Sequence, residues 1–397
     1  MTQRPLPRPL NFTVVFLAAA LTVELLDELV DGATGAAWPL VRQDLGLSYV
    51  ELGLLLGLPG ILVNLVEPFL GLLADLGYRR ALILGGGVCF AASLALFAVA
   101  GGFWPLLAAL VLFYPASGAF VSLTQAALMD AEPSRREQNM ARWALAGSVG
   151  NVVGPLLVGL AVTLGLGWRA VFALLAALTV VALVGTWRSS ALSHGAEAPE
   201  QLDWRDAARG VVASLRRGEV RAALVLLECA NLTGDVFRSF VALYFVDAVG
   251  ATPAAAGLAV AVLTGVGLVG DVLVLPLLER MPGIRYLRMS AWATVLVFPA
   301  FLLVPHLGVK LALLGLLGML NSGWYAVLQA RLYATLPERS GTVMALGSVA
   351  GMASGAVLLG LGVVAQHFGV EAALWLLLAG PLALLVGLPR RVVEGSR

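Results

Sequence analysis

Residues 23–32 read VELLDELVDG, and residues 227–236 read LECANLTGDV. Both stretches place acidic side chains inside otherwise apolar runs of the chain. Glu228 follows Glu24 by 204 residues, and Asp235 follows Asp31 by the same number. Acids inside apolar helices are costly and rare, so their recurrence at one offset indicates that the chain contains two related halves.

Matching or chemically similar residues recur at the same offset along most of each half. The further pairs are Asp27/Asn231, Gly46/Gly250, Ser48/Thr252, Gly53/Gly257, Glu67/Asp271, Asp75/Glu279, Gln125/Gln329, Pro133/Pro337, Met140/Met344 and Gly147/Gly351. Chance does not readily supply polar matches inside apolar stretches, so this recurrence indicates an internal duplication.

The composition is that of a membrane protein. Sixty per cent of the 397 residues are hydrophobic and only 12% are charged, against roughly a quarter charged in soluble domains. Because a spanning helix needs about 20 mostly apolar residues, the sequence predicts an all-α protein with twelve spans in two six-helix bundles. The spans are 12–36, 48–73, 80–100, 105–128, 139–164, 168–188, 220–246, 254–278, 286–304, 309–334, 341–365 and 370–388. Because the offset of 204 residues covers six spans, an even number, the two bundles are predicted to be parallel repeats around an axis along the membrane normal, with a substrate site between them near the bilayer midplane.

The basic residues predict the orientation of these spans. Arg42, Arg169 and Lys310 fall on one side, Arg238 is central, and the other basic residues fall on the opposite side. Because positive residues stay in the cytoplasm, we expect a multi-pass inner (plasma) membrane protein with both termini inside. The first apolar stretch is interrupted by acids and is too long for a signal-peptide core, so we interpret it as a retained helix.

The longest polar stretch separates the two bundles. We expect an N-terminal bundle over residues 1–190, a cytoplasmic linker over 191–219 and a C-terminal bundle over 220–397. Apolar residues between 204 and 215 recur at helical spacing beside arginines. This pattern indicates either a short helix on the inner membrane face or a solvated tether.

The first span carries four acids at positions that share one helix face: Glu24, Asp27, Glu28 and Asp31. At about 100° per residue, their spacing of 0, 3, 4 and 7 confines them to a stripe roughly 100° wide. Each acid at the bilayer centre costs roughly 2.5–3.5 kcal/mol, so the stripe is expected to face a polar cavity. For any single acid, a structural hydrogen bond between helices remains the alternative.

Low dielectric and neighbouring carboxylates both disfavour ionised carboxyl groups, so some of these acids are expected to hold protons near neutral pH. We expect Asp27, Glu28 and Asp31 to carry exchangeable protons, with Glu24 in support. The seventh span repeats the stripe, and the residues expected to complete the site are Glu228, Asn231, Asp235 and Arg238, the last neutralising one acid. Glu67 and Asp271 are interpreted as gating or structural contacts.

The loop after the second span reads GLLADLGYRR over residues 71–80. It resembles the Gly-x-x-x-Asp-Arg-x-Gly-Arg-Arg/Lys pattern of the major facilitator superfamily, and the chain is similar to that family over essentially its whole length. The matching residues are Gly71, Asp75, Arg79 and Arg80, while Leu76 and Tyr78 depart from the pattern. The resemblance implies that this loop latches the inward gate; a solvated turn is the alternative.

The fifth span reads GSVGNVVGPLLVG over residues 147–159. It is similar to the Gly-x-x-x-Gly-Pro-x-x-x-Gly pattern of the family's antiporters at Gly150, Gly154, Pro155 and Gly159. The resemblance implies a proton-coupled exporter, although small residues at this spacing also occur in ordinary helix packing. The intramembrane arginine that such antiporters often carry in the fourth span is replaced by Tyr114.

An acid-rich cavity favours a small cationic or amphiphilic organic cargo. Tyr114, Trp324 and Tyr325 are candidates for cation–π contacts with it, although at least two of the three are expected only to pack. Other cargoes remain open: a divalent metal cation, a sugar, an anionic drug or a lipid. A non-transporting membrane receptor is a further alternative, which the dense acids disfavour.

Several classes of function are excluded or disfavoured. The chain has no zinc-protease, nucleophile-elbow or phosphate-loop motif, so no enzyme activity and no cofactor are expected. Cys89 and Cys229 are interpreted as small apolar residues, and His194, His306 and His367 are too scattered for a metal site. The near-zero net charge and the absence of a basic stripe indicate no nucleic-acid partner. The partners expected are lipid, protons and a small-molecule substrate; one chain contains both halves and suffices as a monomer.

Overall fold

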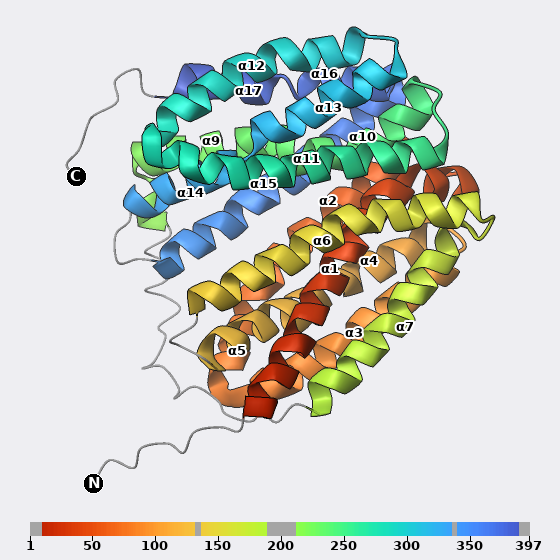
Figure 1. Cartoon of the computed structure of the whole chain (residues 1–397), viewed down its shortest axis with the longest axis vertical. Coiled ribbons are helices and arrows are strands. Elements are labelled where there is room, and N and C mark those ends of the chain that lie inside the picture. Colours follow the sequence, from red (N-terminus) through yellow and green to blue (C-terminus); the bar gives the residue numbers. More distant parts are fainter. Residues whose placement is uncertain (1–9, 132–135, 189–211, 336–339, 389–397) are drawn as a thin grey trace. The chain divides into compact units, whose positions relative to one another are not determined.

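In the computed structural model, residues 10–131, 136–188, 212–335 and 340–388 are described, and the regular elements in these ranges are all helical (Figure 1). The helices of the first half are α1 (Leu10–Leu45), α2 (Tyr49–Leu73), η1 (Ala74–Tyr78), α3 (Arg79–Val99), α4 (Phe103–Ser117), η2 (Gly118–Ser122), α5 (Leu123–Ala131), α6 (Arg136–Thr163) and α7 (Gly167–Arg188). The element η2 is a short π-helical turn that continues α4, whereas η1 contains a kink at Gly77 between α2 and α3.

The second half is also helical, with additional breaks at other positions. Its helices are α9 (Gly218–Asn231), η5 (Leu232–Val236), α10 (Phe237–Leu243), η6 (Tyr244–Ala248), α11 (Pro253–Arg280), α12 (Gly283–Leu303), α13 (Leu307–Asn321), α14 (Trp324–Thr335), α15 (Ser340–Phe368), α16 (Val370–Leu376) and α17 (Ala379–Gly387). The predicted linker helix lies mostly within residues 189–211, outside the described ranges, so the expected domain boundaries stay predictions.

Ten helical segments in the described part of the chain are long and apolar enough to cross a membrane. Two further runs, α1 and the run from α9 to η6, are of comparable length and carry the repeated acids. Together these segments are consistent with the twelve predicted spans, and the all-helical architecture confirms the expected fold class.

The chain divides into two compact units whose segments alternate along the sequence. The first unit contains residues 1–31, 66–151 and 169–200; the second contains residues 32–65, 152–168 and 201–397. The long helices α1, α2 and α6 therefore each contribute residues to both units. This division places the acids of α1 in the first unit and those of the second half in the second unit.

Small residues set the close helix contacts in each unit. In the first unit, a Cβ on Gly86 of α3 would lie 2.8 Å from the Cβ of Ala119 and from the backbone nitrogen of Phe120. In the second unit, a Cβ on Gly318 of α13 would collide with the carbonyl oxygen of Leu263 in α11. Without a hydrophobic drive between helices in lipid, such close approach supplies the packing that holds them together.

The backbone leaves helical geometry at Gly77, Gly234 and Gly323. Gly77 in η1 has a φ of +96°, and Gly323 between α13 and α14 has a φ of +72°. Gly234 in η5 leaves helical geometry with φ −94° and ψ −107°. Backbone groups freed at membrane depth need protein partners or a polar cavity, so the interruptions at Gly234 and Gly323 identify polar regions of the second unit.

Candidate functional site

The acids of α1 are buried to very different degrees. Glu24 is 8% exposed, Asp27 and Glu28 are half-buried, and Asp31 is exposed. The helical spacing places the four on one stripe, and this stripe meets α4 and α6 within the first unit. The gradation separates a protected end of the stripe, at Glu24, from an accessible end, at Asp31.

Asp27 is held by the last residue of α4. The hydroxyl group of Ser117 donates a hydrogen bond to Oδ1 of Asp27 over 2.8 Å. Ser117 stands directly before Gly118, where α4 gives way to the π-helical turn η2. The partner of Asp27 is therefore a neutral group at a helix irregularity.

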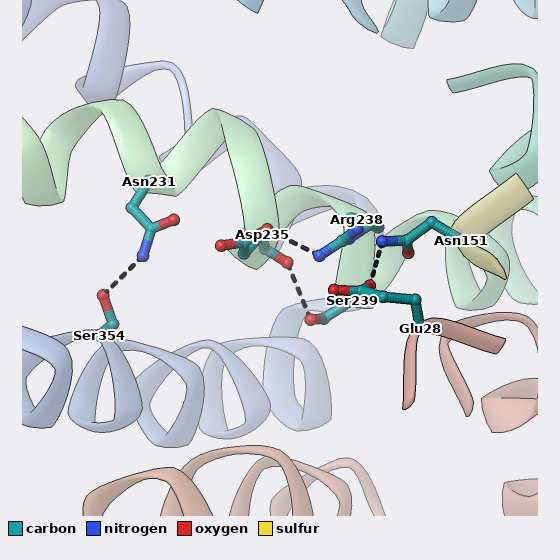
Figure 2. Close-up of polar contacts among 7 residues, drawn as sticks. All are labelled: Glu28, Asn151, Asn231, Asp235, Arg238, Ser239 and Ser354. Carbon is teal, nitrogen blue, oxygen red and sulfur yellow. Dashed lines mark hydrogen bonds and ion pairs between the residues drawn. The ribbon is translucent and has the colours of Figure 1, made fainter. Parts of the chain in front are cut away.

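Glu28 is held by α6. Nδ2 of Asn151 donates a short hydrogen bond to Oε2 of Glu28 (Figure 2). Two glycines of α6 face the same part of α1: a Cβ on Gly150 would lie 2.6 Å from the carbonyl oxygen of Leu25, and a Cβ on Gly147 would lie 2.5 Å from Oε1 of Glu24. The two glycines therefore leave room for the carboxyl groups between the helices.

In the second unit, Glu228 and Asn231 share one partner. The hydroxyl group of Ser354 in α15 donates a short hydrogen bond to Oε2 of Glu228, and Nδ2 of Asn231 donates to Oγ of Ser354 over 3.1 Å. Figure 2 shows the link between Asn231 and Ser354. The acids of the second half thus contact a small polar residue of α15. In that helix, Gly351 and Gly355 lie on either side of Ser354.

Asp235 and Arg238 form an ion pair one turn beyond that contact. Nη2 of Arg238 lies 2.8 Å from Oδ1 of Asp235, whose side chain is 69% exposed. Ser239 donates to the backbone carbonyl of Asp235 over 2.9 Å (Figure 2). Asp235 directly follows Gly234, where the helix is broken, and its side chain is exposed.

The three aromatic candidates lie in three different environments. Trp324 is 2% exposed, belongs to the core of the second unit and donates its indole N–H to Ser290 over 2.8 Å. Tyr325 is 62% exposed, and Tyr114 is half-buried with its ring edge-on to Phe113. The structure therefore makes Trp324 a packing residue and leaves Tyr114 and Tyr325 as the accessible aromatic groups.

The loop residues after α2 fall at a helix break. Gly71 lies in α2, Asp75 in η1, and Arg79 begins α3, followed by Arg80. The positive φ of Gly77 turns the chain between these helices. The latch implied by the resemblance stays a prediction.

The Gly154–Pro155 pair lies in the part of α6 that belongs to the second unit. There a Cβ on Gly257 of α11 would approach the carbonyl oxygen of Pro155 to 3.0 Å. Proline removes an N–H donor and bends its helix. The pair therefore lies where α6 and α11 pack backbone against backbone.

Sequence reasoning did not identify a polar cluster in the second unit. Arg42 of α1 pairs with Asp247 of η6, and the hydroxyl group of Tyr49 donates to the same carboxylate over 2.6 Å. The guanidinium group of Arg42 also lies 4.4 Å from the centre of the Tyr49 ring. The backbone N–H of Tyr49 in turn donates to Oε1 of Gln366 in α15. In the sequence, the charges of Arg42 and Asp247 were the only hint of this cluster, because their positions along the chain give no reason to pair them.

Lys310 was also missed as an interior residue. Its side chain is 3% exposed, and its ammonium group donates to the Tyr244 hydroxyl and the Phe301 carbonyl, each over 2.7 Å, and to the Leu302 carbonyl over 3.1 Å. The sequence had placed this lysine only at a span end. In the structure it binds the last turn of α12.

Within the described ranges, side chains that could bind a metal ion are dispersed. Among the described residues, no group of three or more His, Cys, Asp or Glu side chains is arranged to hold a metal ion. Cys89 and Cys229 are half-buried free thiols. The polar groups brought together are instead carboxyl groups with hydroxyl, amide and guanidinium partners.

Comparison with known proteins gives concordant results. The family model of the Major Facilitator Superfamily matches residues 20–360. The fosmidomycin resistance protein of Escherichia coli (strain K12) is 28% identical over 178 residues, which cover 44% of this chain and 44% of that protein. The chain thus aligns with less than half the length of this curated relative.

Solved structures share the fold. A bacterial homolog to the human lysosomal transporter Spinster, inward-facing and occupied, matches with a TM-score of 0.75 and 15% identity over 96% of each chain. The nucleoside transporter NupG matches with a TM-score of 0.75 and 14% identity, over 96% of this chain and 98% of its own. The POT family transporter PepTSo matches with a TM-score of 0.73 and 14% identity, over 96% of this chain and 97% of its own. Likeness at these identities shows the fold alone.

Proposed function

The chain belongs to the Major Facilitator Superfamily and is a membrane transporter rather than an enzyme, and from this premise we propose that it is a proton-coupled exporter. Its cargo would be a small organic compound of cationic or amphiphilic character. No nucleotide-binding motif was found in the sequence, so the energy would come from an ion gradient. Alternating access between the two halves would move cargo and protons in opposite directions.

One observation carries the proton-coupling part of the proposal. Asp27 and Glu28 accept hydrogen bonds from the neutral side chains of Ser117 and Asn151. Because these two partners carry no charge, neither of them holds the carboxyl group in its ionised form by charge pairing. A hydroxyl group can also reverse its role from donor to acceptor when the carboxyl group becomes protonated. This arrangement supports reversible proton binding at Asp27 and Glu28.

The location of the stripe adds to this support. Glu24 is buried, whereas Asp31 is exposed at the other end. The row of acids therefore connects an accessible end with a protected end inside the first unit, as a path for protons requires.

Two lines of support favour export of a cation or amphiphile. A relative named for resistance to fosmidomycin supports export over uptake, because a resistance protein can act by removing a compound. In the second half, Arg238 is paired with Asp235, while Glu228 is held by a neutral hydroxyl group. Acid groups would thus remain available to a positively charged cargo.

Location and topology belong to the same proposal. The arginine distribution supports the inner membrane, with both termini in the cytoplasm. The exposed large apolar side chains along the spans, among them Val181, Leu296 and Val386, are those expected on lipid-facing helix surfaces.

The test uses purified protein in proteoliposomes with an imposed pH gradient. Candidate cargoes, fosmidomycin and organic cations among them, are first screened for flux that depends on the gradient. We expect Asp27→Asn and Glu28→Gln to abolish gradient-driven flux, whereas Glu219→Gln, which alters an exposed acid in the first turn of α9, leaves it intact. Full coupling in both α1 variants would reject the proton site.

A further inference from the structure

The fourth helical run of each half is interrupted at the same place in the repeat. In the first half, α4 ends at Ser117 and the π-helical turn begins at Gly118. In the second half, α13 ends at Asn321 and the chain leaves helical geometry at Ser322 and Gly323. Asn321 follows Ser117 by 204 residues, the offset that relates the two halves.

An acid on the second helix of each half meets this interruption. Oδ1 of Asp271 in α11 accepts the backbone N–H of Gly323 over 3.1 Å. The repeat partner of Asp271 is Glu67 in α2, and its carboxyl group lies against Gly118: a Cβ there would be 3.2 Å from Oε1 of Glu67. The absence of a side chain at Gly118 therefore makes room for the Glu67 carboxyl group.

The residue before each interruption donates to the first helix of its own half. Nδ2 of Asn321 donates to the backbone carbonyl of Thr233 over 2.7 Å. Ser117 donates to the carboxylate of Asp27 over 2.8 Å. In each half, an acid of the second helix thus contacts the break in the fourth helix, and the residue before that break donates a hydrogen bond to the first helix. In the first half, the acceptor of that hydrogen bond is a carboxyl group.

We propose that Glu67 is a positioning residue that holds the η2 turn so that Ser117 presents its hydroxyl group to Asp27. π-helical turns are rare and occur frequently at functional sites, and neighbouring side chains can define the position of such a turn. The Glu67 carboxyl group lies beside Gly118 at the start of this turn, whereas Asp271 accepts a hydrogen bond from Gly323 at the equivalent place. This inference rests on the proposed role of Asp27 as a proton site.

The experiment reads the environment of Asp27 directly and does not depend on finding the cargo. Infrared difference spectra of purified protein, recorded across a pH titration, contain the carboxyl C=O band of Asp27, assigned by its loss in Asp27→Asn. Removing the hydroxyl partner in Ser117→Ala is expected to shift this band. Glu67→Ala is expected to shift it in the same direction, and the double variant Glu67→Ala/Ser117→Ala to shift it no further.

Two more variants guard against a merely structural explanation. Glu67→Asp is expected to restore the band, because the second half uses aspartate at the equivalent position. Gly118→Ala is expected to reproduce the shift while keeping Glu67, since the added methyl group would push its carboxyl group away from the turn. If Glu67→Ala does not fold, the band shift in Gly118→Ala tests the same contact. Glu219→Gln serves as the control acid.

The outcomes separate the two proposals. If the wild type shows no Asp27 band that changes with pH, the proton site itself is wrong and the positioning role falls with it. If the band is present and Ser117→Ala moves it, but Glu67→Ala and Gly118→Ala leave it in place, only the role of Glu67 is overturned. Additive shifts in the double variant would likewise overturn it.

Discussion

Arg42 in α1 and Asp247 in η6 form an ion pair in which Nη2 and Oδ2 are 3.0 Å apart. Both side chains are about three-quarters buried, and both lie in the second unit. They belong to different halves of the repeat, as do Tyr49 and Gln366 beside them. This cluster therefore ties the end of α1 and the start of α2 to helices of the second half.

If the protein works by the proposed alternating access, this tie must break each time that end of the bundle opens. We expect Asp247→Asn to favour the opened state by about 1 kcal/mol, or about fivefold, the upper range for a partly exposed pair. The measurement is the rate at which a membrane-impermeant maleimide labels Leu52→Cys, a fully buried position of α2, in a background without Cys89 and Cys229.

Glu51→Gln is the matched control for this labelling experiment. Glu51 lies near the same end of α2, but its hydrogen bonds go only to Ser48, three residues away. Equal labelling rates in Asp247→Asn and Glu51→Gln would show that the ion pair does not hold that end closed.

Gly150 determines how closely α6 approaches the acids of α1. A methyl group there would lie 2.6 Å from the Leu25 carbonyl oxygen and 2.9 Å from the Glu28 Cβ. We expect Gly150→Ala to lower stability by about 1–3 kcal/mol, the usual cost of overpacking. Gly85→Ala in α3 adds a methyl group in open space and should leave stability unchanged or slightly raised. Thermal unfolding in detergent compares the two, and equal midpoints would contradict the packing argument.

Lys310 binds the last carbonyl groups of α12. A cation at a helix C-terminus satisfies acceptors that the helix leaves unpaired. Lys310→Met would leave the Phe301 carbonyl without this donor, whereas the Leu302 carbonyl keeps the hydroxyl group of Tyr244. We expect a loss of about 2 kcal/mol, typical of an unsatisfied buried polar group.

The same thermal measurement tests this prediction. Tyr244→Phe removes one hydroxyl group and keeps the ammonium group on both carbonyls, so its midpoint should lie between those of Lys310→Met and the wild type. A Lys310→Met midpoint equal to the wild type would show that the lysine contributes nothing to the helix end.

Ser354 is the shared partner of Glu228 and Asn231. If these residues line the cargo cavity, Ser354→Ala should raise the apparent KM for cargo by about tenfold, as expected for loss of a hydrogen bond to a charged group. The maximal rate and the proton dependence should change little. Ser148→Ala is the control, since that exposed hydroxyl group bonds only within its own helix. A KM that stays at the wild-type value would place Glu228 outside the cargo path.

Local patterns in the sequence anticipated much of the framework. Helical periodicity placed Glu24, Asp27 and Glu28 on one face, because successive residues advance by a constant angle. Apolar length identified the spans, since lipid demands internally bonded helices of that length. The same reasoning could not tell that Trp324 is buried, because the sequence around an aromatic residue in an apolar helix does not show whether its side chain packs in the core or faces a cavity.

The sequence by itself determined the helical class, the duplication at an offset of 204 and the acidic face of α1, because each follows from spacing along one dimension. Only the tertiary structure decided that Ser117 holds Asp27, that Asn151 holds Glu28 and that Arg42 pairs with Asp247. These partners are 90 or more residues apart. A hydrogen bond forms only when two atoms come within about 3 Å, and that depends on how each helix is rotated about its axis and where helices cross, which no local pattern encodes.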